Sequence, residues 1–135
     1  MSAPEKILLV DGHSAIFALP EFRSFHQGET RYLARLELVK WLQRFADVSD
    51  WNTVVVFDGK QAERGLEGGK SEGVLILYSR KGETADSVIE RLAARFGEKD
   101  HVLVASNDGM VRTTCAVFGT QTCTVETLRV MVEGR

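Results

Sequence analysis

The chain has 135 residues with a formal net charge of −2, and 44% of its residues are hydrophobic and 27% charged. These values are typical of one soluble globular domain, 1–135, that is large enough to bury its own core. No apolar run approaches the roughly 20 residues of a membrane helix. No cationic segment precedes the short apolar stretch near the start, so we expect a cytoplasmic protein with no membrane partner. The charge balance excludes a globally basic surface for nucleic acid.

Strands and helices alternate along the chain. In order, the patterns predict a strand at 7–10, a loop with a turn of helix at 14–30, a helix at 31–46, a strand at 54–57, a loop at 59–73, a strand at 74–78, a helix capped by Thr84 that runs to 96, a strand at 101–105, a helix at 109–118, a short strand at 121–124 and a closing helix at 125–132. This rhythm favours an α/β fold in which a parallel sheet of about five strands carries helices on both faces.

Three of the predicted strands lead into an acidic residue. The strand at 7–10 precedes Asp11, the strand at 54–57 precedes Asp58, and the strand at 101–105 is followed after two residues by Asp108. Short continuous apolar runs are typical of strands buried on both faces of a parallel sheet. Since ligands bind outside the carboxyl ends of the strands in such sheets, the three carboxylates are expected at one edge.

A fourth carboxylate, Asp86, lies in the first turn of the helix that Thr84 caps, and Glu90 follows one turn later. The two share one side of that helix, beside its apolar stripe. A hard divalent cation needs oxygen ligands that converge from several elements, and such ions activate water for phosphoryl displacement. The predicted catalytic residues are Asp11, Asp58, Asp86 and Asp108, and the predicted metal ligands are Asp11, Asp86 and Asp108.

Each of these acidic residues also has an ordinary structural interpretation. Asp11 and Asp58 precede glycines, as turn residues often do. Asp86 suits the positive end of a helix dipole, and Asp108 suits a helix N-cap. Glu90 suits a solvated helix surface. Their common placement favours a site, because independent turn residues need not all fall at the same edge of one sheet.

Four segments carry a resemblance to a known family: VDGHSAI at 10–16, VVVFDG at 54–59, KGETADSVIERL at 81–92 and ASND at 105–108. They resemble the NYN domain of the YacP-like ribonucleases, a branch of the PIN-like nuclease superfamily, and the likeness extends over nearly the whole chain. The resemblance implies a three-layer Rossmann-like sandwich and a divalent metal, Mg²⁺ or Mn²⁺. It also implies that the family's acidic residues fall on Asp11, Asp58, Asp86 and Asp108.

One position departs from that family. YacP-like proteins typically carry Tyr-Asn after the first Asp-Gly, whereas this chain has His13 and Ser14. The DGHS sequence is similar to the opening of the 5′-nuclease domains associated with DNA polymerase I, which are also PIN-like, but the chain lacks their length. A serine hydroxyl orients a carboxylate or a phosphate with a shorter reach than an asparagine amide. The secondary site candidates are Ser14, Glu90, Asn107 and His13.

Basic residues supply candidates for holding the phosphate backbone of RNA. They are Lys60, Arg64 and Lys70 in the glycine-rich loop, Arg80 and Lys81 before the acidic helix, and Arg112. Each of them, taken alone, is also an ordinary surface charge. The loop at 59–73 contains five glycines and few apolar residues, which predicts a mobile segment beside the acidic edge.

Three functions compete at this point. The first is a metal-dependent ribonuclease that hydrolyses RNA phosphodiester bonds, which we favour. The second is a catalytically impaired PIN-like domain that binds RNA or protein, and the third is another phosphate-handling α/β domain. A Walker A loop and a GxGxxG motif are absent, which disfavours an NTPase or a dinucleotide enzyme. Cys115 and Cys123 form no zinc or redox pattern and are interpreted as small buried hydrophobic residues.

Overall fold

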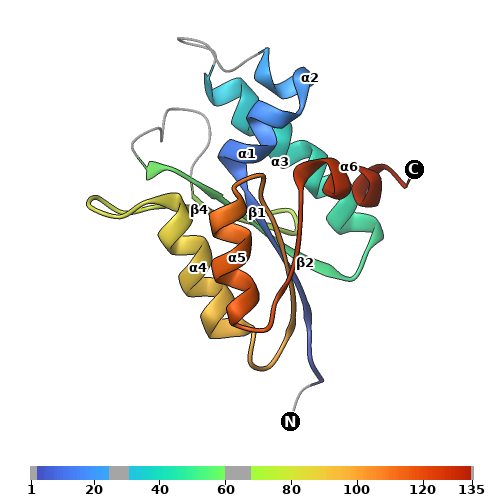
Figure 1. The fold of residues 1–135 in the computed structure, drawn as a ribbon. Coiled ribbons are helices and arrows are strands. Elements are labelled where there is room, and N and C mark those ends of the chain that lie inside the picture. The colour runs from blue at the N-terminus through green and yellow to red at the C-terminus, as the bar shows by residue number, and fades with distance from the viewer. Residues whose placement is uncertain (1–2, 25–30, 60–67, 135) are drawn as a thin grey trace.

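The computed structural model describes residues 3–24, 31–59 and 68–134. Its elements, in chain order, are β1 (Lys6–Asp11), α1 (Gly12–Ala18), α2 (Pro20–Arg23), α3 (Arg31–Val48), β2 (Trp51–Phe57), β3 (Gly69–Ser71), β4 (Val74–Tyr78), α4 (Ala85–Phe96), β5 (His101–Ala105), α5 (Gly109–Val117), β6 (Gln121–Cys123) and α6 (Val125–Glu133). Figure 1 shows these helices around a twisted central sheet. No helix in the described ranges is long and apolar enough to cross a membrane.

The strands form one sheet in the order β3-β4-β2-β1-β5-β6. All neighbouring strands are parallel except β3 and β4. β1 lies in the middle, where Leu9 is opposite Val54 of β2 and Val104 of β5. The expected α/β fold is confirmed. Because β1, β2 and β5 are parallel neighbours, the residues that follow them meet at one edge of the sheet.

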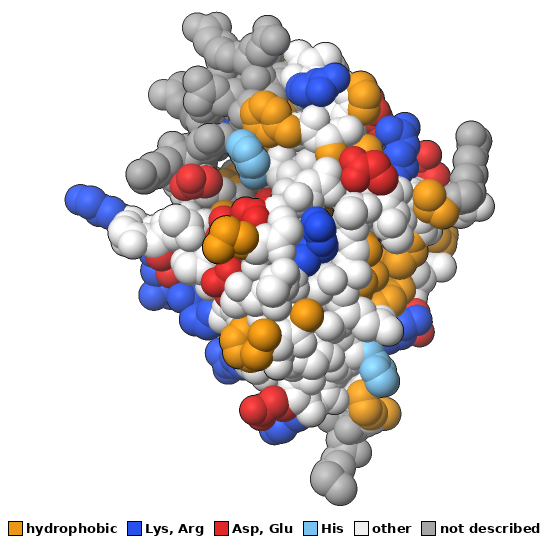
Figure 2. Space-filling view, in the orientation of Figure 1, with side chains coloured by type: hydrophobic (Ala, Val, Ile, Leu, Met, Phe, Trp, Pro, Cys, Tyr) orange, Lys and Arg blue, Asp and Glu red, His pale blue; other side chains and the backbone are white. Residues whose placement is uncertain are grey.

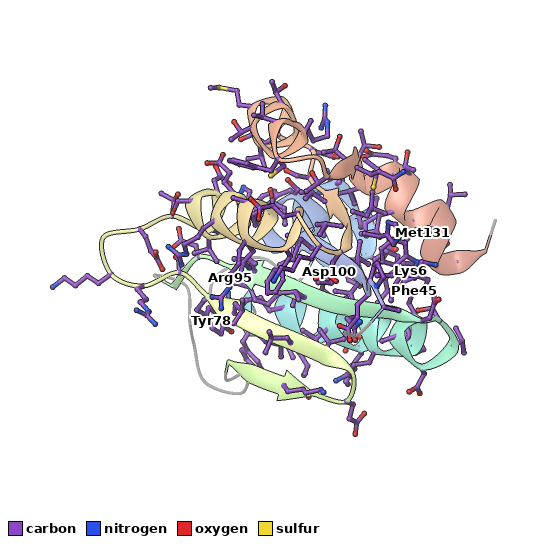
Figure 3. The ribbon with its side chains drawn as sticks, turned by 90° about the horizontal axis from the view of Figure 1, so that it is seen from below. Lys6, Phe45, Tyr78, Arg95, Asp100 and Met131 are labelled. Carbon is purple, nitrogen blue, oxygen red and sulfur yellow. The ribbon has the colours of Figure 1, made fainter. Side chains whose placement is uncertain are left out.

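The side chains of β1 alternate between two hydrophobic cores, one on each face of the sheet. Leu8 and Val10 pack with residues of α1, α2, α3 and α6. Ile7 and Leu9 pack with residues of α4 and α5. In the view from below, the strands run between α4 on one side and α3 on the other (Figure 3). The two-residue period of a strand thus produces the three layers of the sandwich.

The described part of the segment predicted as a loop with one turn of helix, residues 14–24, forms two short helices instead. Residues 25–30 lie outside the described residues. Asp11 caps α1 by accepting from the Ser14 N–H, and Pro20 occupies the start of α2, a position that suits its fixed φ. Ile16 and Phe22 anchor the two helices in the core. The prediction contains too little helix. It treats Pro20 as a residue that ends helical structure, whereas Pro20 begins a second helix, α2.

Part of the predicted loop at 59–73 is a strand. β3 pairs antiparallel with β4, and the turn between them has positive φ at Glu72 (43°) and Gly73 (86°). Backbone pairing at a sheet edge needs no apolar period, so the sequence carries no signal for this sixth strand. Residues 60–67 of that loop, which include Lys60 and Arg64, lie outside the described residues, and the mobility of the loop stays a prediction.

Both cysteines are free thiols. Cys115 is buried in α5, where burial raises the pKa of its thiol to about 11. Burial also raises the pKa of Cys123, which is half-buried in β6. Because the thiolate is the nucleophile and the metal ligand, these residues act as small apolar side chains, as the sequence predicts.

One charged side chain lies inside the core. Arg35 of α3 is 1% exposed, and none of its side-chain nitrogens has a hydrogen-bond partner of good geometry in the described part of the chain. The charge of Arg35 affects the nearby Tyr78, which is labelled in Figure 3. Burial raises the pKa of Tyr78, and Arg35 opposes that shift. A buried guanidinium that recovers so little of its lost hydration opposes folding.

We therefore expect Arg35→Met to raise the free energy of unfolding by about 1–4 kcal/mol, because methionine fills much of the same space without a charge to desolvate. Urea denaturation of the two proteins measures the difference. Arg44→Met, at an exposed position of the same helix, is the matched control and should change stability by less than about 0.5 kcal/mol. A clear loss of stability in Arg35→Met would show that the guanidinium holds the core together.

Candidate active site

Asp11 ends β1 at the middle of the sheet and caps α1. It is 3% exposed. Ser14 donates to its carboxylate from the backbone N–H at 3.2 Å and from the hydroxyl at 2.8 Å, and the Ser106 hydroxyl donates at 2.7 Å. These three hydrogen bonds replace hydration that the buried carboxylate has lost and fix its orientation.

The turn from β1 into α1 requires a glycine after Asp11. A Cβ on Gly12 would lie 2.5 Å from Cδ1 of Phe57 and 2.9 Å from the carbonyl oxygen of Val56. The first turn of α1 therefore lies directly against β2. Ser14 lies in this first turn, and its N–H donates to Asp11 as part of the helix cap.

Asp108 reaches the same edge of the sheet from the turn between β5 and α5. It is exposed and caps α5, with Oδ1 accepting from the N–H of Met110 at 2.9 Å and of Val111 at 3.4 Å. The buried Ser106 hydroxyl accepts from the Asp108 N–H at 3.1 Å while it donates to Asp11. Ser106 thus connects the two acidic turns. The sequence analysis does not single it out, because a buried serine has no pattern of its own.

Asp86 lies half-buried in the first turn of α4. Burial is the main cause that raises the pKa of Asp86. The negative charges of Asp11, Asp108 and Glu90 raise this pKa further, and the charge of His13 acts in the opposite direction. The carboxylates therefore repel one another across a common space. We call Asp11, Asp86, Glu90 and Asp108 the acidic cluster.

Asp58 stands at the end of β2 and is tied to the neighbouring strand end. The Ser79 hydroxyl lies 3.5 Å from its Oδ1 and accepts from the Gly59 N–H at 2.8 Å. A Cβ on Gly59 would lie 1.8 Å from the carbonyl oxygen of Ser79, so only glycine fits there. Asp58 is not among the charges that raise the pKa of Asp86. We therefore do not count it in the acidic cluster.

His13 and Asn107 flank the acidic cluster. His13 is exposed on α1, and its ring centroid lies 4.5 Å from that of Phe17. The Asn107 side chain holds the start of α6, where its Oδ1 accepts from the Val125 N–H at 2.8 Å. Only the backbone N–H of Asn107 points to the site, donating to the Ser14 hydroxyl at 3.1 Å. Asn107 therefore acts on the structure of the turn.

The basic candidates fall into two groups in the described part of the chain. Lys70 on β3, and Arg80 and Lys81 in the turn before α4, are exposed. Arg112 is half-buried, and its Nη1 donates to the carbonyl oxygen of Ser106 at 2.7 Å. Arg112 therefore supports the turn that carries Asp108, while the other three remain open to an anion.

Figure 2 shows acidic side chains gathered over the upper ends of α4 and α5, with a histidine above them. Among the described residues, no three His, Cys, Asp or Glu side chains stand in an arrangement that holds a metal ion without adjustment. The cluster instead presents carboxylates from separate elements with one face toward solvent. Hard cations and the groups that accompany them bind to such oxygen-rich surfaces.

Comparison with known proteins gives the family. The model of the YacP-like NYN domain matches residues 8–134. The chain belongs to this family. It is a PIN-like nuclease family, and the NYN domain here covers nearly the whole chain.

Solved structures support the same relationship. The NYN domain is similar to Rae1 (YacP) from Bacillus subtilis, with a TM-score of 0.81 and 25% identity, over 96% of this chain and 74% of that one. A point mutant of the same Bacillus protein matches with a TM-score of 0.80 and 25% identity, over 96% of this chain and 75% of that one. No curated protein sequence matches the chain.

The burial of Asp86, reinforced by the negative charges around it, makes stability depend on pH. Because its pKa is raised, the folded protein binds a proton there at a higher pH than the unfolded chain does, so stability falls as the pH rises through that range. In metal-free buffer we expect Asp86→Asn to raise the melting temperature at neutral pH. The gain should disappear below about pH 4, where both states of the wild-type residue are protonated.

Glu126→Gln is the matched control, because it also removes a carboxylate from the first turn of a helix, α6. Glu126 also accepts a hydrogen bond from Nδ2 of Asn107 at 3.2 Å, which the amide oxygen of glutamine is able to accept as well. The main loss is therefore a favourable interaction with the helix dipole, and stability should fall by about 0.3–1 kcal/mol. If Asp86→Asn lowers the melting temperature as Glu126→Gln does, Asp86 is not under repulsion in the folded protein.

Proposed function

We propose that this NYN domain is a metal-dependent ribonuclease that hydrolyses RNA phosphodiester bonds at the carboxyl edge of its sheet. The placement of the carboxylates carries the proposal, because the Ser106 hydroxyl joins Asp11 to the turn of Asp108. Burial, together with the negative charges of Asp11, Asp108 and Glu90, raises the pKa of Asp86 beside them. Such crowding opposes folding and is typical of sites that use it for chemistry. Membership of a PIN-like nuclease family supports the same conclusion.

The residues of the acidic cluster suit Mg²⁺ or Mn²⁺. Asp11, Asp86 and Asp108 offer carboxylate oxygens, which hard cations prefer, and a cation would neutralise their repulsion. Ser14 and Ser106 hold Asp11 in place, whereas Asp86 and Asp108 keep part of their surface in solvent and are able to adjust. When bound, the metal activates a water and stabilises charge on the phosphodiester.

Residues around the cluster take supporting roles in this proposal. Glu90, one turn after Asp86, adds negative charge at the same place. Asp58 lies at the next strand end and orients water or the ribose beside the scissile phosphate. His13 is exposed next to the cluster and contacts a phosphate oxygen of the substrate.

Asparagine substitutions remove the charge and keep the helix caps. At Asp11 the substitution also removes the oxygen that accepts from the Ser14 and Ser106 hydroxyls, so circular dichroism must show that Asp11→Asn is folded. Asp11 and Asp108 cap helices, and asparagine caps a helix about as well as aspartate does. We expect Asp11→Asn, Asp86→Asn and Asp108→Asn each to lower RNA cleavage by on the order of a hundredfold or more, because each removes a charge that holds the metal. The assay uses labelled single-stranded and structured RNA with Mg²⁺ or Mn²⁺.

Asp47→Asn, at an exposed position of α3, is the control and should cleave like the wild type. Mn²⁺ should also stabilise the wild type, by about 2.7 kcal/mol at a hundredfold excess over Kd, and Asp11→Asn should weaken that effect. Cleavage that continues in EDTA, or in all three asparagine variants, would overturn the proposal.

The exposed cations beside the acidic helix are proposed to hold the RNA backbone. They are Lys70, Arg80 and Lys81, with Lys60 and Arg64 as further candidates outside the described residues and Arg112 as a supporting residue. We expect the double variant Arg80→Ala, Lys81→Ala to bind RNA more weakly and with a flatter salt dependence, by about 0.7 in slope per lost contact. Lys99→Ala, beyond the far end of α4, is the control. An unchanged slope in the double variant would remove this turn from the RNA-binding surface.

A second candidate is a domain that binds RNA or protein without cleaving. His13 and Ser14 favour it, because the Ser14 hydroxyl donates to Asp11 and accepts from Asn107. That hydroxyl is already engaged within the protein. The cleavage assay separates the two candidates: this one requires RNA or protein binding by the wild type with no cleavage in either metal.

A further inference from the structure

A shallow groove lies next to the acidic cluster, at the start of α5. Its lining residues are Asp108, Gly109, Met110, Thr113 and Thr114, and its volume is about 520 Å³. Met110 is 80% exposed, whereas Val111 and Cys115 of the same helix are buried in the core. The core therefore gives no reason for a large apolar side chain at this position.

The groove and the acidic cluster share Asp108. Its carboxylate accepts from the Met110 N–H at 2.9 Å, and its negative charge also raises the pKa of Asp86. A group bound in the groove therefore lies next to any phosphodiester held by the cluster. On α1, the aromatic pair of His13 and Phe17 also adjoins the cluster. Figure 2 shows a hydrophobic side chain among the acidic ones on this face.

The lining of the groove suits a nucleobase. The thioether of Met110 is flexible and polarisable and packs well on an aromatic face. The hydroxyls of Thr113 and Thr114 donate and accept, so they match the mixed edge of any base. The described lining contains no Lys or Arg, and the guanidinium of Arg112, which lies close to Gly109, donates to the Ser106 carbonyl oxygen. This disfavours a phosphate group as the occupant. Its volume falls within the range of small-molecule sites.

We propose that this groove binds the base of an unpaired nucleotide next to the scissile phosphodiester, with Met110 packed on the face of the base. The inference rests on the proposed function, because it takes the RNA backbone to cross the acidic cluster. In a duplex the faces of each base are covered by its neighbours, so the groove admits a nucleotide only where the RNA is unpaired. Met110 thereby contributes to the choice of cleavage position.

A double-mutant cycle between protein and RNA tests the contact. A short labelled single-stranded RNA is prepared with one abasic nucleotide at each position in turn, and binding is measured in an Asp86→Asn background that prevents cleavage. We expect one position where loss of the base weakens binding by roughly two- to tenfold. That penalty should vanish when Met110→Ala is added, because the partner of the base is then missing.

Two further variants make the test specific. Val117→Ala is the matched control, because Val117 lies on the same helix and is 78% exposed, and it should leave the abasic penalty unchanged. Gly109→Leu should weaken binding by filling the groove, since a Cβ there meets only Nη2 of Arg112, at 3.8 Å, and causes no clash. Circular dichroism confirms that both variants are folded.

The outcomes separate this inference from the proposed function. Coupling between Met110 and one base supports the groove even if the wild type cleaves no RNA in either metal. Cleavage by the wild type, with no abasic position that depends on Met110, overturns the groove and leaves the ribonuclease proposal standing. An equal effect of Val117→Ala also overturns it, because the contact would then not be specific to the groove.

Discussion

The buried carboxylate of Asp11, held by two serine hydroxyls, is the interaction on which this edge of the molecule depends. Ser14 belongs to the helix that Asp11 itself caps, and Ser106 belongs to the turn that follows the neighbouring strand β5. A carboxylate taken out of water is tolerated only when hydrogen bonds replace its hydration. The three hydrogen bonds to Asp11 therefore fix two turns relative to each other, and with them the place of Asp108.

The crowding of carboxylates lowers the stability of the fold, and the proposed chemistry uses the same crowding. The Asp11 and Asp108 carboxylates lie near enough to raise the pKa of Asp86, a group already penalised by burial. The same repulsion that weakens the fold is what a divalent cation would relieve. Arg35 is a second unfavourable charge, inside the core, where its guanidinium has no hydrogen bond of good geometry in the described part of the chain. The two hydrophobic cores on the faces of the sheet must offset both.

Much of this molecule follows from patterns that are local in the sequence. Continuous apolar runs identify β1, β2, β4 and β5, and the apolar stripe after Thr84 identifies α4. The Asp-Gly and Ser-Asn-Asp-Gly endings of three strands identify the edge where the acidic residues lie, because parallel strands end together. These features are short-range, so a single sequence is sufficient to show them. The family resemblance rests on the same segments.

Other features depend on contacts that no local pattern contains. Ser106 acts through Asp11, 95 positions away in the chain, although it looks like a polar residue of a loop. Asn107 of the same loop holds the start of α6, and Arg112, which looks like a surface charge of a helix, donates to a backbone carbonyl. β3 exists because β4 offers it a free edge. The sequence by itself determined that acidic residues and glycines follow the ends of the strands, and hence the kind of site. Only the tertiary structure decided which carboxylates repel one another and which polar side chains hold them, because those energies depend on distance and burial in the folded chain.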